Sequence, residues 1–175
     1  QYASYLERLK TLVQVVQELS LARDIKKIRG IVVSTARLLT GAEGATFVLR
    51  DGNFCHYVDE EAISPLWKGK RFPLEQSVSG QRRGHHEPTI IVGIYTESRV
   101  PIDAYKPTFV KSLAMVPIRT ASPIGAIGNY WSTVHRPTPE DVNLLQALAD
   151  TTAVAIKNVQ VYNELEQRVE QRTSE

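Results

Sequence analysis

The chain has 175 residues, of which 42% are hydrophobic and 23% are charged. These fractions match ordinary globular domains, so a disordered or collagen-like chain is excluded, and the length predicts one domain with some helical extension. The formal net charge is only +2. Because binding through counterion release needs a much more basic surface, we expect no nucleic-acid partner.

Cysteine usage and hydropathy indicate the compartment. The single cysteine, Cys55, cannot form an internal disulfide, and it excludes a cysteine-rich zinc site. A membrane helix needs about 20 apolar residues, but the best candidate, 112–134, contains Arg119 and two prolines. The first residues lack the basic-then-apolar order of a signal peptide. We therefore expect a cytoplasmic protein in a reducing compartment, with no direct membrane contact.

Two helices are predicted at the start of the chain. Over residues 2–19, an apolar stripe with 3-4-3 spacing is typical of a helix that needs a partner; it consists of Leu6, Leu9, Val13 and Val16. The second helix is predicted to begin after Asp24 as N-cap and to end at Gly41. Gly30 inside this helix lowers helix stability by about 1 kcal/mol relative to alanine, so we expect close packing as the reason for a glycine there.

Strand patterns follow. Alternation over 45–49, an Asp51-Gly52-Asn53 turn and a second run over 54–58 predict a β-hairpin. From 59 to 111 the pattern is irregular, with five of the nine prolines and one short strand-like run at 89–92. A connection of this length in a compact domain is usually functional.

Two further strands, 112–119 and 123–133, are predicted around a turn at 120–122. The first is apolar at almost every position, which predicts that both of its faces are covered. Pro117 cannot donate to a sheet ladder, so we expect a bulge or break there. Gly125 and Gly128 indicate bends or a close approach of another chain segment.

A long final helix is predicted from the Thr138-Pro139 start signal onward. Its apolar stripe has no visible end, so a helix of about 35 residues would be about 50 Å long and would project from the domain. The stripe consists of Leu148, Thr152, Ala155, Val159 and Tyr162, followed after a phase slip by Leu165 and Val169. We expect this helix to continue past residue 175.

The order of these elements resembles a GAF domain. The runs 99–119, 123–131, 144–150 and 158–169 are similar to the GAF subfamily of bacterial sensor histidine kinases and related two-component signalling proteins. The resemblance covers about residues 20–170. It implies an α+β fold with an antiparallel sheet of five or six strands, terminal helices packed on one face, and a pocket-forming irregular segment on the other.

The resemblance also implies an organisation. Residues 1–19 would be an N-terminal dimerisation helix, 20–160 the GAF domain, and 161–175 a C-terminal coiled-coil signalling helix leading to an effector outside this sequence. We expect a homodimer that pairs through helices 2–19 and 140–172. Because fold alone does not establish a ligand, the cofactor stays unknown.

Reactive side chains give no catalytic or metal site. Bilin-binding relatives attach their chromophore through a cysteine in a later segment, whereas Cys55 and His56 are adjacent on a predicted strand and point to opposite faces. Adjacent histidines such as His85 and His86 chelate a metal poorly. GAF-fold methionine sulfoxide reductases need a second thiol, and the motifs of a kinase core are absent from this sequence. We therefore expect neither catalysis nor a metal.

The candidate ligand site lies between the sheet and the 59–111 segment. Aromatic and apolar side chains suited to a pocket wall are Trp67, Tyr95, Tyr105, Phe109, Met115 and Tyr130. Arg82 and Arg83 stand near its mouth, where an arginine could meet a carboxylate or phosphate. Two alternatives stay open: the basic stretch is only an exposed loop, and the aromatics only fill a small second core.

Three functions are consistent with these features. The leading hypothesis is a non-catalytic GAF sensory domain of a bacterial two-component signalling protein, which binds a small molecule or relays a signal through a dimeric helix to a histidine kinase. The alternatives are a bilin-binding photoreceptor domain and a degenerate GAF module that acts only as a dimerisation spacer.

Overall fold

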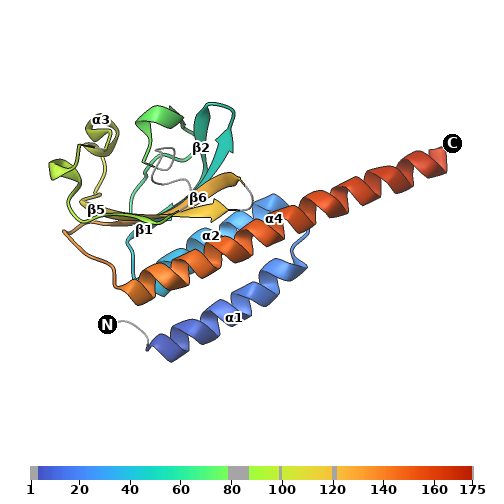
Figure 1. Cartoon of the computed structure of the whole chain (residues 1–175), viewed down its shortest axis with the longest axis horizontal. Coiled ribbons are helices and arrows are strands. Elements are labelled where there is room, and N and C mark those ends of the chain that lie inside the picture. Colours follow the sequence, from blue (N-terminus) through green and yellow to red (C-terminus); the bar gives the residue numbers. More distant parts are fainter. Residues whose placement is uncertain (1–3, 79–86, 99, 120–121, 175) are drawn as a thin grey trace.

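The computed structural model describes residues 4–78, 87–98, 100–119 and 122–174. A six-stranded antiparallel sheet with the order β3-β2-β1-β6-β5-β4 carries three helices on one face and the irregular segment on the other (Figure 1). This arrangement confirms the predicted α+β fold. In chain order the elements are α1 Tyr5–Leu21, α2 Ile25–Thr40, β1 Gly44–Asp51, β2 Phe54–Ala62, β3 Arg71–Pro73, β4 Thr89–Ile91, α3 Ile102–Tyr105, β5 Ser112–Arg119, β6 Pro123–Trp131 and α4 Pro139–Ser174, with 3₁₀ turns at Leu74–Gln76 and Ile94–Thr96.

Helix α2 begins and ends as its sequence predicts. The Asp24 side chain accepts a hydrogen bond from the Lys27 amide, and Gly41 closes the helix with a φ of 69°, a conformation that glycine adopts without strain. The expectation for Gly30 is wrong. A Cβ atom built at Gly30 would meet no atom within 4 Å, because this part of α2 faces an open cleft beside α1.

Helix α1 has two apolar faces. Its inner face contacts the domain through Arg8, Leu12, Val15 and Leu19, all buried. The stripe singled out in the sequence lies mostly on the outer face, where Leu6 is 62% and Val13 58% exposed. One face is therefore used within the chain, while the second stays open to solvent.

The sheet separates two hydrophobic cores. Along β5, Ala114, Val116 and Ile118 belong to the core beneath the helices, whereas Leu113 and Met115 belong to the core under the irregular segment. This alternation confirms that both faces of β5 are covered. The predicted hairpin is also confirmed, with Asp51 paired to Phe54 and Gly52 at a φ of 61°, as a two-residue hairpin turn requires.

Pro117 does not break β5 where the sequence places the break. The ladder continues through the Pro117–Ala126 pair, and the irregularity falls one residue later, between Ile118 and Arg119. Strand β4 pairs only with residues 113–115 of β5, so Pro117 lies beyond it and β5 loses no partner there. Gly125 confirms the expected close approach, because a Cβ atom would collide with the Val48 carbonyl oxygen.

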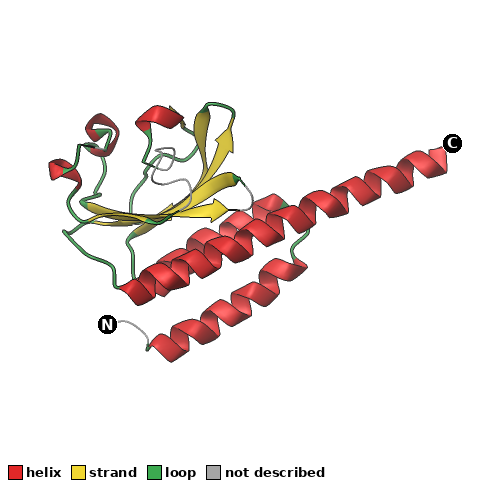
Figure 2. Ribbon diagram, in the orientation of Figure 1, coloured by secondary structure: helices red, strands yellow, loops and turns green. Residues whose placement is uncertain are grey.

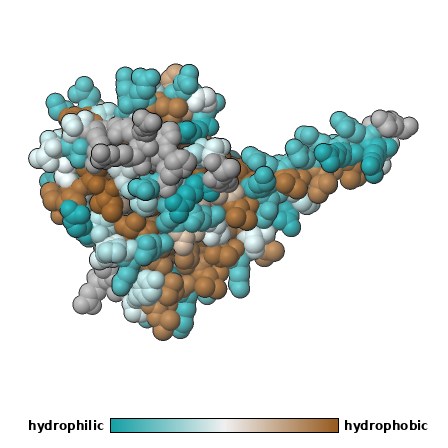
Figure 3. Space-filling view, in the orientation of Figure 1, coloured by the Kyte–Doolittle hydropathy of each residue, from teal (hydrophilic) through white to brown (hydrophobic). Residues whose placement is uncertain are grey.

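Helix α4 is continuous over 36 residues, and its second half projects from the domain (Figures 1 and 2). The predicted stripe has two environments. Leu148, Thr152, Ala155 and Val159 are buried within the chain, whereas Tyr162, Leu165 and Val169 are exposed. Hydrophobic residues recur among hydrophilic ones along the projecting part (Figure 3).

Candidate functional site

An aromatic cluster fills the core under the irregular segment. The Trp67 ring lies 4.7 Å from the Tyr105 ring and 5.2 Å from the Tyr130 ring, measured between centroids, and Tyr57 lies 5.6 Å from Trp67 on another side. All four side chains are buried. Rings from β2, β6, α3 and the 63–70 connection therefore converge on one point above the sheet.

Five of the eight predicted site residues belong to this cluster. Trp67, Tyr105, Met115 and Tyr130 are buried members and Phe109 packs against them, while Tyr95 is 54% exposed and is not a member. Arg82, Arg83 and the His85-His86 pair lie outside the described residues. The structure thus brings most of the predicted wall together, and ligand binding by these residues stays a prediction.

The position of Tyr130 depends on a glycine. The Tyr130 hydroxyl lies 2.8 Å from the Thr46 hydroxyl on the neighbouring strand, and a Cβ atom at Gly128 would collide with the Tyr130 hydroxyl. The ring therefore lies along the sheet over a residue without a side chain. Burial raises the pKa of Tyr130 and of Tyr105 well above the ordinary tyrosine value, so both phenols stay neutral at a pH where an exposed tyrosine ionises.

Trp67 is fixed from two sides. Its indole Nε1 donates to the Ala104 carbonyl at 2.9 Å, which ties the 63–70 connection to α3. The Glu60 carboxylate accepts the backbone amides of Leu66, Trp67 and Lys68 at 2.7–2.8 Å. Glu60 was not predicted as a site residue, because among the described residues its carboxylate binds backbone amides, which leave no pattern of partner residue types.

The described side chains of the cluster are tightly packed. The cavity among Tyr57, Trp67, Phe72, Val78 and Tyr105 measures about 10 Å³, which is room for about one water molecule. In this state the described aromatics pack as a second core. A ligand at this position would have to displace part of this packing, in which residues of α3 and of the 74–78 turn line the pocket.

Cys55 lies at the base of the same cluster. Its side chain is 1% exposed, and the Ser77 hydroxyl donates to its Sγ atom at 3.1 Å. His56 belongs to the opposite face of β2. The pair is therefore not a local nucleophile and base, and this thiol is enclosed rather than presented to solvent.

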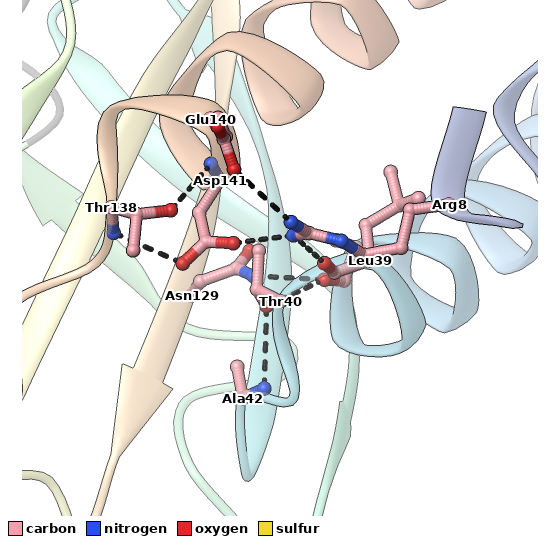
Figure 4. Close-up of polar contacts among 9 residues, drawn as sticks. Arg8, Leu39, Thr40, Ala42, Asn129, Thr138, Glu140 and Asp141 are labelled. Carbon is pink, nitrogen blue, oxygen red and sulfur yellow. Dashed lines mark hydrogen bonds and ion pairs between the residues drawn. The ribbon is translucent and has the colours of Figure 1, made fainter. Parts of the chain in front are cut away.

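A second buried site joins three helices (Figure 4). Arg8 Nη1 donates to the Asp141 carboxylate at 2.5 Å and to the Leu39 carbonyl at 3.0 Å. Asp141 also accepts the Thr138 amide at 3.0 Å, while its own amide donates to the Thr138 hydroxyl at 3.1 Å, a reciprocal cap of the first turn of α4. The start of α1, the end of α2 and the start of α4 therefore meet at one guanidinium.

This junction was not predicted, although the sequence contains a signal for it. Arg8, Leu12, Val15 and Leu19 follow a 4-3-4 spacing, so an arginine stands in line with an apolar stripe. A charge at such a position indicates a buried partner. Nothing local identifies Asp141, which lies 133 residues away.

Comparison with known proteins agrees with this geometry. The sequence profile described as "GAF domain" matches residues 22–157. The chain belongs to the GAF family. No curated protein sequence matches it.

Several solved structures share the GAF fold. The GAF domain of a phosphoenolpyruvate-protein phosphotransferase from Coxiella burnetii superposes with a TM-score of 0.78 at 15% identity, covering 93% of this chain and 99% of that one. Free methionine-R-sulfoxide reductase from Neisseria meningitidis superposes with a TM-score of 0.75 at 16% sequence identity, covering 93% of this chain and 97% of that one. The chromophore-binding domain of a bacteriophytochrome from R. palustris superposes with a TM-score of 0.76 at 13% sequence identity, covering 93% of this chain but 64% of that one. These identities show the fold alone.

Two further properties bear on the site. None of the described helices is both long enough and apolar enough to cross a membrane. Within the described ranges, no three histidine, cysteine or acidic side chains come together as metal ligands.

Proposed function

We propose that this GAF domain is a non-catalytic sensory module of a cytoplasmic bacterial two-component signalling protein, which relays its state through a dimeric helix to a histidine kinase. The observation that carries the proposal is the continuity of α4. Residues up to Val159 form part of the domain core, and every described side chain from Gln160 to Thr173 is exposed. A displacement of the packed half is therefore transmitted along the same helix to the projecting half.

Strand β5 connects the aromatic cluster to α4. Met115 lies in the cluster, while Val116 packs beneath the helices with Leu144 and Leu148 of α4. Gln146 of α4 donates to the Pro117 carbonyl at 3.0 Å. A change in the cluster that moves β5 therefore moves contacts of α4.

A second copy of the chain would cover the exposed stripes. Helices α1 and α4 run in the same direction (Figure 1), and both leave apolar side chains in solvent, with Val13 58% and Leu165 54% exposed. Burial of this apolar surface favours association by roughly 25 cal/mol per Å². A parallel homodimer through α1 and α4 buries both stripes across one two-fold axis.

The ligand of the sensory module would be a small molecule held by the aromatic cluster. The structural neighbours include chromophore-binding domains and an enzyme in complex with its substrate. An anionic group on the ligand would suit Arg82 and Arg83. The photoreceptor alternative receives no support from Cys55, since the thiol is buried.

The tight packing of the cluster favours a second candidate, a GAF dimerisation spacer. A cavity of about 10 Å³ holds no organic ligand, so a spacer would keep this packing permanently. Mass spectrometry of small molecules released by denaturing the purified chain separates the two candidates. A compound near one equivalent per chain supports the sensor, whereas empty protein whose melting temperature is unchanged by a panel of small carboxylates and phosphates supports the spacer.

Dimerisation is tested by light scattering at tens of micromolar protein. We expect a dimer for the native chain and a monomer for the double variant Val13→Glu plus Leu165→Glu. The control is Gln14→Glu plus Asn163→Glu, which places two carboxylates on exposed positions of the same helices away from the apolar stripes and should leave the dimer intact. A monomeric native chain would refute the dimeric relay.

A further inference from the structure

A cleft of about 630 Å³ lies where α4 passes the ends of β1 and β6. Four elements contribute to its wall: α2 with Ile25, β1 with Leu49, β6 with Ile124, and α4 with Ala153 and Ile156. These residues belong to or pack against the core beneath the helices. The cleft and the aromatic cluster are therefore on opposite faces of the sheet.

The floor of this cleft is apolar and incompletely covered. Ala153 and Ile156 are buried, but Ile25, Leu49 and Ile124 are only half-buried, so aliphatic surface stays accessible in a concave place. A volume between about 300 and 1,000 Å³ is typical of sites that bury most of a small ligand. The floor is suited to an aliphatic chain.

The rim of the cleft is cationic. Lys157 is exposed and lines it, and it is the single charged residue of α4 between Asp150 and Glu164. Arg50 also lines the cleft, and no carboxylate does so among the residues that the structure describes. A negatively charged group is therefore favoured at the point where the apolar floor meets solvent.

We propose that this cleft binds an aliphatic carboxylate of medium chain length, with the chain along Leu49, Ile124 and Ile156 and the carboxylate at Lys157. The site rests on its own geometry and not on the proposed sensory function. Its position adds a consequence: the bound chain lies between the sheet and α4 immediately before Gln160, where the exposed half of α4 begins. A bound ligand would stabilise the position of α4 where the helix leaves the domain, on the face of the sheet opposite the aromatic cluster.

A fluorescence titration tests the site in the full chain, with 11-(dansylamino)undecanoate as the probe. We expect saturable binding near one equivalent, displaced by dodecanoate but not by dodecyltrimethylammonium, which has the same chain and the opposite charge. Lys157→Glu should lower the affinity for the probe by about tenfold, which is the effect of losing a charge-assisted contact. Arg168→Glu makes the same charge change on the same helix beyond the cleft and should leave the affinity unchanged.

A floor variant and two further arms complete the test. Ile124→Asn should lower the affinity for the probe while the circular dichroism spectrum stays native. The monomeric double variant Val13→Glu plus Leu165→Glu should still bind the probe, and this result separates the site from the dimer proposal. The proposal is overturned by non-saturable binding, by equal displacement with the cationic surfactant, or by equal affinities of Lys157→Glu and Arg168→Glu. Binding of the chain only to anionic phospholipid vesicles would also overturn it, as evidence for a membrane contact.

Discussion

Arg8 of α1 and Asp141 of α4 form an ion pair at 2.5 Å in which both side chains are almost fully buried, at 8% and 2% exposure. A buried pair of this kind contributes little net stability, because desolvation offsets most of the attraction, but an unpaired partner is costly. Arg8 therefore fixes where α1 lies along α4. A shift of α1 by one turn would leave the Asp141 carboxylate without its cation.

Removing the arginine should be strongly destabilising. We expect Arg8→Met to lower the free energy of unfolding by about 3 kcal/mol, since Asp141 stays buried without a counter-charge. Urea unfolding followed by circular dichroism measures this change. Arg119→Met is the matched control, because the Arg119–Asp150 pair is largely exposed and such pairs contribute at most about 1 kcal/mol.

A double-mutant cycle attributes the loss to the pair. Asp141→Asn keeps an acceptor for the Thr138 amide, and we expect Arg8→Met plus Asp141→Asn to lose at least about 1 kcal/mol less than the sum of the single losses. Additive losses would show that Arg8 acts only through the Leu39 carbonyl and its own packing.

The sequence predicts what local chemistry controls. Asp24 and Gly41 cap α2, Gly52 turns the hairpin, and Thr138 opens α4, and in each case the deciding hydrogen bonds or backbone angles lie within a few residues. Contacts between residues far apart in the sequence were not predicted. Both stripes of α1 are visible in the sequence, but the partners of Arg8 on the inner face, Asp141 and the end of α2, are brought together only by the folded chain.

The candidate site shows the same division. Aromatic residues in the 59–111 segment predict a wall, and Trp67 and Tyr105 do converge with Tyr130. The four elements carry rings whose positions need to change by only an ångström or two to turn a packed core into a cavity. The amino-acid composition does not determine positions so finely. The role of Glu60 in fixing Trp67 was hidden for a different reason, because its carboxylate binds backbone amides and not side chains of a recognisable type.

Two glycines should respond in opposite directions to alanine. Gly128→Ala is expected to destabilise by about 1–3 kcal/mol, because the new methyl group displaces the Tyr130 hydroxyl from Thr46. Gly30→Ala should stabilise by about 0.5–1 kcal/mol, since its site in α2 is open and alanine is the better helix former. Thermal and urea unfolding measure both, and a stabilised Gly128→Ala would contradict the position of Tyr130.

Alkaline pH should destabilise the fold through Tyr105 and Tyr130. Burial raises the pKa of both phenols well above the ordinary value, so the folded chain keeps them neutral while the unfolded chain ionises them above about pH 10. Their contribution is complete below pH 10 and falls as pH rises further, by up to about 1.4 kcal/mol per pH unit for each tyrosine. Urea unfolding at pH 9 to 11 measures the slope, and Tyr130→Phe should reduce it. An unchanged slope in that variant would contradict the assignment.

Cys55 should be unreactive in the folded chain and should carry no chromophore. Because its side chain is 1% exposed and its Sγ atom accepts from Ser77, a thiol reagent reaches it only after local opening. We expect Ellman's reagent to react at least about a hundredfold more slowly than with the denatured chain. Chain produced in cells that synthesise biliverdin should show no visible absorption band after denaturation. A band that survives denaturation and is lost in Cys55→Ser would instead establish a photoreceptor and would require the 74–78 turn to open over the thiol.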